Sequence, residues 1–203
     1  MRKKMVVMGL WGILSVALCT ATAAQNAATT GGPVFEVVPV QSSIKFSVKS
    51  SVGIQGTFGK WDAKLTFPSP DVTSGKLQIK IQAGSVSTGS GMKDNKLKGK
   101  DFFYVKENPL ITFVSNKVVQ TGPTNFEVSG EFTIRGVTKP EKLMLTITGK
   151  GTGEGTIQGA MAFDRKEYGM DKGIPFIKIA DRVEVTVNLK TKQVSGSRLI
   201  YKQ

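Results

Sequence analysis

Residues 126–134 read FEVSGEFTI, and this stretch is the clearest guide to the fold. Every second residue is apolar or glycine, so a β-strand would point these residues to one face and the polar ones to the other. The same alternation recurs in about eight main stretches, with a further short one over residues 34–38. Turn-forming sequences separate them, as in PSPD at 68–71 and GKGTG at 149–153.

So many consecutive strands with one apolar face each favour a sheet that closes on itself, because closure leaves no exposed edge. We therefore predict an all-β fold, an antiparallel lipocalin-like barrel of about eight strands with one short helical insertion. A barrel of this size either fills with its own side chains or holds a small ligand. Gly130 and Gly159 fall at inward positions. They mark either bends that close the barrel or space for a cavity.

The insertion is expected within residues 87–113, STGSGMKDNKLKGKDFFYVKENPLITF, where the alternation stops. Ser90 is expected to cap a short helix with its side chain, and Gly99 to end it in a left-handed conformation. Asp101 would cap a second tight turn. We interpret the segment as a lid over one end of the barrel; the alternative is a crossover whose aromatic residues complete the core. Met92, Leu97, Phe102 and Phe103 would face inward, and Lys93, Lys96, Lys98 and Lys100 would face water or an anionic head group.

The N-terminal residues have the features of a secretory signal peptide, predicted over residues 1–24. Basic residues 2–4 precede an apolar run at 5–18 and the small-residue pattern Ala21-Thr22-Ala23. The run is shorter than the roughly 20 residues of a membrane span. A flexible leader at 25–33 and one domain at 34–203 would follow, in the periplasm or secreted. The single cysteine, Cys19, would leave with the signal peptide.

The chain is strongly basic, with a formal net charge of +13. Cleavage would remove three of these charges and leave the mature protein basic. The lysines alternate with apolar residues, as in residues 76–81, which is typical of the solvated face of a sheet. We therefore expect no nucleic acid partner, and a transient contact with an anionic membrane surface instead. The barrel rims and the lysine-rich lid would also support a homodimer.

The sequence contains no histidine, which excludes Ser-His-Asp machinery and imidazole metal sites. We expect neither a metal nor a cofactor. Asp164 and Asp181 are the carboxylates placed near strand ends. A charged turn with its own ion pairs is the favoured interpretation of that region. We therefore predict that the protein is not an enzyme, with a carboxylate-dependent hydrolase of a lipid phosphate as a minor alternative.

Five ordered motifs make the chain from about residue 35 to 189 resemble the YceI-like family of exported lipid- or polyisoprenoid-binding proteins. They are SIKFSVK at 43–49, GIQGTFGKW at 53–61, the central motif of MKDNKL at 92–97 with DFF at 101–103 and PLITF at 109–113, GEFTIRGVTKP at 130–140, and RKEYG at 165–169. The resemblance implies a long apolar pocket that takes a polyisoprenoid chain, such as a quinone or prenyl phosphate tail. It also implies that the protein carries or sequesters this lipid without transforming it. Many members have histidine in place of Ser50, and arginine and histidine in place of Lys93 and Lys96, so the head-group preference stays open.

The predicted site has three parts. The tail would contact apolar residues of the barrel wall, the lid would cover it, and basic residues at the mouth would bind the head group. The alternative is a solid-barrel periplasmic stress or interaction protein without a lipid ligand. The tail residues are Ile44, Phe46, Ile79, Phe113, Phe132, Ile134, Met161 and Phe163; the lid residues are Met92, Leu97, Phe102 and Phe103; and the head-group residues are Lys93, Arg135 and Arg165.

Overall fold

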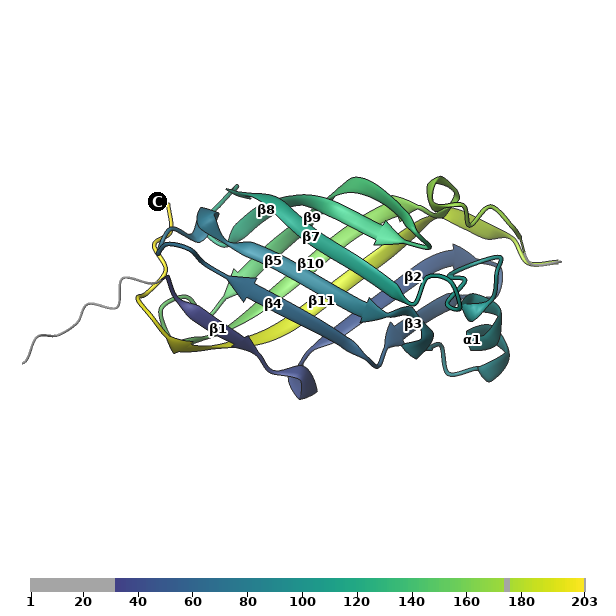
Figure 1. Ribbon diagram of the computed structural model, residues 1–203, viewed down its shortest axis with the longest axis horizontal. Coiled ribbons are helices and arrows are strands. Elements are labelled where there is room, and N and C mark those ends of the chain that lie inside the picture. The colour runs from purple at the N-terminus through teal and green to yellow at the C-terminus, as the bar shows by residue number, and fades with distance from the viewer. Residues whose placement is uncertain (1–31, 174–175, 203) are drawn as a thin grey trace, which may run out of the picture.

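A computed structural model describes residues 32–173 and 176–202 (Figure 1). The predicted signal peptide at 1–24 and most of the predicted leader at 25–33 lie outside the described residues. The described part consists mainly of strands, with one α-helix and four short 3-10 helices. The strands are β1 (Val34–Val37), β2 (Ser43–Ser50), β3 (Ile54–Phe58), β4 (Trp61–Thr66), β5 (Lys76–Gln82), β6 (Val86–Ser87), β7 (Leu110–Gln120), β8 (Asn125–Ile134), β9 (Val137–Thr148), β10 (Glu154–Asp164) and β11 (Ile179–Ser195). The helices are α1 (Gly91–Lys98), η1 (Pro39–Gln41), η2 (Val72–Ser74), η3 (Ala83–Ser85) and η4 (Arg165–Tyr168).

The strands form one closed antiparallel barrel. β1 pairs with β4 on one side and with β11 on the other, so the first strand meets the last. β1 and β2 both pair with β11 and act as one interrupted strand, and β3–β4 and β5–β6 behave in the same way. The eleven segments therefore form an eight-stranded barrel, in which each interrupted pair counts as one strand. The prediction of an eight-stranded antiparallel barrel with one helical insertion is confirmed.

Strand β8 shows how the sequence pattern produces the barrel wall. Phe126, Val128, Gly130, Phe132 and Ile134 are all buried, and the residues between them are more exposed. The alternation is therefore the inside–outside alternation of a closed sheet. No helix in the described residues is long and apolar enough to cross a membrane.

The two inward glycines make room for close packing. A Cβ atom on Gly130 would lie 2.5 Å from the Val114 carbonyl oxygen, beside the register shift between Ser115 and Lys117 in β7. A Cβ atom on Gly159 would lie 2.9 Å from Leu145 Cδ2. Neighbouring atoms already occupy both positions. The interpretation that these glycines leave space for a cavity is therefore wrong.

Helix α1 lies across one end of the barrel, but its ends differ from the prediction (Figure 1). Ser90 is the N-cap residue without a side-chain cap bond. Instead, the Thr88 amide and hydroxyl donate to Asp94 Oδ1 at 2.8 and 2.6 Å. Gly99 has a φ of −70°, so it is not left-handed. Asp101 accepts a bond from Lys96 Nζ instead of capping a turn.

The C-terminal segment closes the opposite end of the barrel (Figure 1). The Ile200 amide donates to the Pro70 carbonyl at 2.8 Å, and Ile200 in turn accepts a bond from the Val72 amide at 3.1 Å. The Tyr201 ring packs 6.3 Å from the Phe126 ring. The interior is thus covered by α1 at one end and by residues 196–202 at the other.

Candidate functional site: an apolar cavity beneath helix α1

An apolar cavity of about 70 Å³ lies inside the barrel at the α1 end. Strands on every side of the barrel except β9 contribute to it, and the lid covers it. Arg165 is the one charged residue in its lining. The lining residues are Ile44, Phe46, Val48, Ile54, Phe58, Ile81, Leu97, Phe102, Phe103, Ile111, Phe132, Ile134, Phe163, Arg165, Met170, Ile179, Val183 and Val185.

Three residues of the lid enter the cavity as expected from the sequence. Leu97, Phe102 and Phe103 are buried and line it. The Phe103 ring lies 6.4 Å from the ring of Phe46 and 6.0 Å from that of Phe58, so the lid packs directly on strands β2 and β3. Such aromatic contacts add to the free energy of apolar burial.

Met92 does not face inward, and this part of the prediction is wrong. Its side chain is 85% exposed, whereas Leu97 on the same helix is buried. Residues five apart on an α-helix lie about 140° apart around the axis, because each residue turns the helix by about 100°. Once Leu97 points into the barrel, Met92 must point away from it.

An ion pair fastens the end of the lid. Lys96 Nζ lies 2.6 Å from Asp101 Oδ2, and both side chains are partly exposed. The hydrogen bond from Lys96, together with its charge, lowers the pKa of Asp101. The same ammonium group lies 5.9 Å from the centre of the Phe102 ring. The ion pair therefore lies beside Phe102 of the lid.

An aromatic cluster supports one wall of the cavity. The rings of Phe132, Phe163 and Tyr168 lie 5.1 to 5.5 Å apart. Tyr168 is completely buried, and its hydroxyl donates to Glu141 Oε1 at 2.8 Å. Burial, and next the bond to Glu141, raise the pKa of Tyr168. Sequence reasoning missed this residue, although it stands in the RKEYG motif that carried part of the family resemblance.

Three of the predicted tail residues lie outside the cavity lining. Ile79, Phe113 and Met161 are buried, but each sits deeper along its strand than a neighbour that lines the cavity. A second apolar cavity of about 40 Å³ lies beyond them. We call Ile79, Phe113 and Met161 the waist of the barrel. The second cavity is lined by Leu65, Phe67, Val72, Gly75, Leu77, Val118, Phe126, Val128, Leu145, Ile147 and Ile157.

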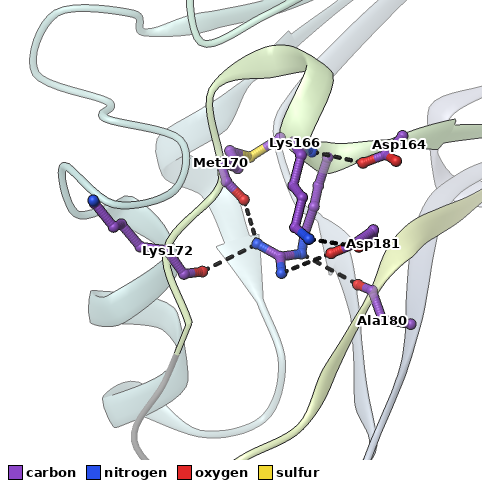
Figure 2. Close-up of polar contacts among 7 residues, drawn as sticks. Asp164, Lys166, Met170, Lys172, Ala180 and Asp181 are labelled. Carbon is purple, nitrogen blue, oxygen red and sulfur yellow. Dashed lines mark hydrogen bonds and ion pairs between the residues drawn. The ribbon is translucent and has the colours of Figure 1, made fainter.

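Arg165 is buried beside the cavity and is held by four acceptors (Figure 2). Its Nε donates to the Ala180 carbonyl at 3.2 Å, and Nη1 donates to the carbonyls of Met170 and Lys172. Its Nη2 pairs with Asp181 Oδ1 at 3.0 Å. These bonds tie η4 to the start of β11. The predicted head-group role of Arg165 therefore competes with a structural role that uses most of its donors.

The other two predicted head-group residues lie at the rim. Lys93 Nζ lies 3.3 Å from the Gly53 carbonyl oxygen, which links α1 to the β2–β3 turn. Arg135 occupies the β8–β9 turn with a φ of +53°, and its Nη2 donates to the Lys100 carbonyl at 3.1 Å. Its Nε is buried and has no hydrogen-bond partner among the described residues. Neither residue lines the cavity itself.

The two carboxylates considered for catalysis have structural partners. Asp164 Oδ1 accepts a bond from the Lys166 amide at 2.8 Å and caps η4. Asp181 pairs with both Arg165 and Lys166. A hydrogen bond from Lys166 and the nearby positive charges lower the pKa of Asp181, and a lowered pKa does not suit a general acid at neutral pH. Residues 32–173 and 176–202 contain no cluster of three metal-binding side chains of the His, Cys, Asp or Glu type.

The fold and the cavity define a closed, lipocalin-like barrel with an apolar interior. Residues 35–191 match the model of the YceI-like domain, and the chain belongs to this family. A UPF0312 protein of Shewanella denitrificans is 31% identical over 154 residues, which cover 69% of this chain and 78% of that protein. A UPF0312 protein of Pseudomonas savastanoi is 34% identical over 98 residues; the match covers 48% of this chain and only about half, 51%, of that relative's length.

Solved structures share the fold. Burkholderia cenocepacia BcnA has a TM-score of 0.69 and 26% identity, over 76% of this chain and 99% of that chain. A polyisoprenoid binding domain from Saccharophagus degradans, implicated in plant cell wall breakdown, has a TM-score of 0.64 over 79% of this chain and 99% of that chain. With 15% identity, the second likeness shows the fold alone.

Proposed function

We propose that the protein binds the apolar tail of a polyisoprenoid lipid in the cavity beneath α1, and that it carries or sequesters this lipid unchanged. The observation behind the proposal is the cavity itself, whose lining is apolar apart from Arg165. The Saccharophagus degradans domain of the same fold is a polyisoprenoid binding domain, which gives the ligand class to test first.

The cavity must expand to accept a tail. At about 70 Å³ it is well below the roughly 300–1,000 Å³ of ordinary ligand sites. Burial contributes roughly 0.8 kcal/mol per methylene, so a dozen carbons supply about 10 kcal/mol before the costs of ordering and opening are subtracted. The lid and the waist are the parts that have to move, since they separate the cavity from solvent and from the second cavity.

The head group would bind at the rim. Quinone carbonyls and prenyl phosphates both need hydrogen-bond donors where the tail leaves the barrel. Lys93 and Arg135 lie there, whereas most donors of Arg165 are already used within the protein. Export is part of the same proposal: the basic residues, apolar run and small residues at 1–24 support cleavage and delivery to the periplasm.

The small volume of the cavity favours one alternative, a solid barrel that acts through its surface as a periplasmic stress or interaction protein. The first experiment separates the two. The processed protein is purified from exporting cells and extracted with organic solvent, and the extract is analysed by mass spectrometry. A stoichiometric isoprenoid supports the carrier. An empty extract, together with failure of added quinone to bind, supports the solid barrel.

A cavity-filling variant makes the test residue-specific. Val183→Phe adds a ring to a buried position in the cavity lining and should lower the amount of bound isoprenoid at least about tenfold, at a stability cost of roughly 1–3 kcal/mol. Val114→Phe makes the same change on the outer face of β7 and should bind as the wild type does. Equal lipid content in both variants would contradict the cavity as the binding site. An aspartate at Phe132 would also block the tail, but an unpaired charge in the aromatic cluster would destabilise the fold.

A further inference from the structure

Exposed apolar side chains gather on three neighbouring segments at the α1 end of the barrel. Met92 on α1 is 85% exposed, Val52 in the β2–β3 turn is 49% exposed, and Phe176 before β11 is fully exposed. Single exposed apolar residues are ordinary, whereas exposed apolar residues that gather in one region mark an interaction site. We refer to Met92, Val52 and Phe176 as the rim residues.

Hydrogen bonds place the three segments side by side. Lys93 Nζ contacts the Gly53 carbonyl oxygen at 3.3 Å, which joins α1 to the β2–β3 turn. The Ser51 amide donates to the Lys178 carbonyl at 3.1 Å, which joins the same turn to the segment of Phe176. The turn therefore lies between the other two segments, and all three segments lie at the α1 end of the barrel (Figure 1).

Lysines surround this apolar surface. Lys49, Lys100 and Lys178 are exposed, and within the described residues none has a carboxylate within ion-pair distance. At this end Asp101 and Asp181 are paired with basic side chains, whereas Glu107 and Asp171 are exposed, each next in sequence to an exposed lysine, Lys106 and Lys172. The surface thus combines exposed apolar tips with positive charge.

We infer that the α1 end of the barrel docks on an anionic phospholipid bilayer, with the rim residues in the head-group region and Lys49, Lys100 and Lys178 against the lipid phosphates. Apolar tips beside lysines have the chemistry of a surface that lies on a membrane without crossing it. This orientation points the lid, which covers the cavity, at the bilayer. The contact depends on the outer surface alone, so it holds whether or not the cavity takes a lipid.

Vesicle binding tests this inference. The protein beginning at Gln25, which retains every described strand, is sedimented with phosphatidylcholine vesicles with and without phosphatidylglycerol. We expect binding to the anionic vesicles that weakens with salt. Lys100→Glu with Lys178→Glu should weaken it at least about 25-fold, at roughly fivefold for each lysine lost. Lys76→Glu with Lys117→Glu changes two exposed lysines on β5 and β7 away from this end and is the matched control.

A second readout tests the orientation. The form without residues 1–24 contains no cysteine, so Met92→Cys can be labelled with an environment-sensitive dye, with Val40→Cys on η1 as the exposed control. Anionic vesicles should shift the emission of the dye at position 92 and leave that at position 40 unchanged. The inference is overturned by absent vesicle binding, by equal losses in both lysine variants, or by equal shifts of both dyes. The wild type could instead be a dimer that binds no vesicles and that Lys100→Glu with Lys178→Glu dissociates. That result would assign the surface to a second copy of the chain.

Discussion

Arg165 fastens one side of the barrel mouth. Its guanidinium reaches three backbone carbonyls and Asp181, while Lys166 pairs with the same carboxylate from the solvent side (Figure 2). A planar group with five donors can serve several acceptors at once, which an ammonium group cannot do in the same geometry. The sequence shows only a charged turn here, because the acceptors of Arg165 are mainly backbone atoms that no side-chain pattern records.

Arg165→Met should lower the free energy of unfolding by about 2–4 kcal/mol, because buried acceptors lose their donor. Lys166→Met is the matched control: its side chain is half exposed, so its loss should cost below about 1 kcal/mol. Urea denaturation measures both. Arg165→Lys should fall between them, and equal losses for Arg165→Met and Lys166→Met would contradict the structural role of the guanidinium.

Tyr168 makes stability depend on alkaline pH. Burial raises its pKa above the ordinary value, so above pH about 10 the unfolded chain releases this proton while the folded protein keeps it. Below that pH the ionisation of Tyr168 does not reduce the free energy of unfolding. Above it, the free energy of unfolding falls by up to about 1.4 kcal/mol per pH unit. Tyr168→Phe should lose about 0.5–1.5 kcal/mol at neutral pH through the missing hydrogen bond, yet decline less steeply in alkali.

Glu141→Gln is the informative control for this effect. It removes the charge beside Tyr168 but keeps the ring buried, so most of the alkaline loss should remain, since burial is the larger cause of the raised pKa. Urea unfolding at several alkaline pH values gives the slopes, and phenolate absorbance follows the titration. A native protein in which Tyr168 ionises near pH 10 would refute the assignment.

At the scale of elements, the lid is held by one face of α1 and by the aromatic residues that follow it. Leu97→Ala should speed amide hydrogen exchange in residues 97–105, because removing a buried leucine costs about 2–5 kcal/mol of packing. Met92→Ala on the exposed face should change exchange by no more than the equivalent of about 0.5 kcal/mol. Similar exchange in the two variants would mean that the lid does not depend on its contacts with the cavity.

The sequence predicted the existence and the position of this lid but not its details. A break in strand alternation is visible in residues 87–113, and so are the glycines and lysines. The direction of Met92 follows from the helix phase, which only the packing of Leu97 sets. Ser90 makes no side-chain cap bond, and the helix start is instead tied to the preceding chain by the bonds from Thr88 to Asp94, because nearby polar side chains compete for partners in this turn.

At the scale of the whole molecule, the alternation in stretches such as residues 126–134 was enough to predict a closed barrel. Its period of two residues tells which side chains point inward, and β8 follows it throughout. The period carries no information on depth. Ile79, Phe113 and Met161 share inward parity with the residues of the cavity lining, yet they form the waist. The interior packing around Gly130 and Gly159 was equally invisible, because it depends on atoms from other strands.

Pairing of β1 with β11 determines when the protein can finish folding. Val34 pairs with Ser195, so β1 has no complete partner strand until nearly the last residue has been synthesised. Contacts this distant in sequence form late, because closing the long loop between them costs chain entropy before the contacts stabilise the fold. A growing chain therefore stays open, with unpaired strand edges, for the whole time of its synthesis. Such a chain requires protection from premature edge-to-edge association during its biogenesis.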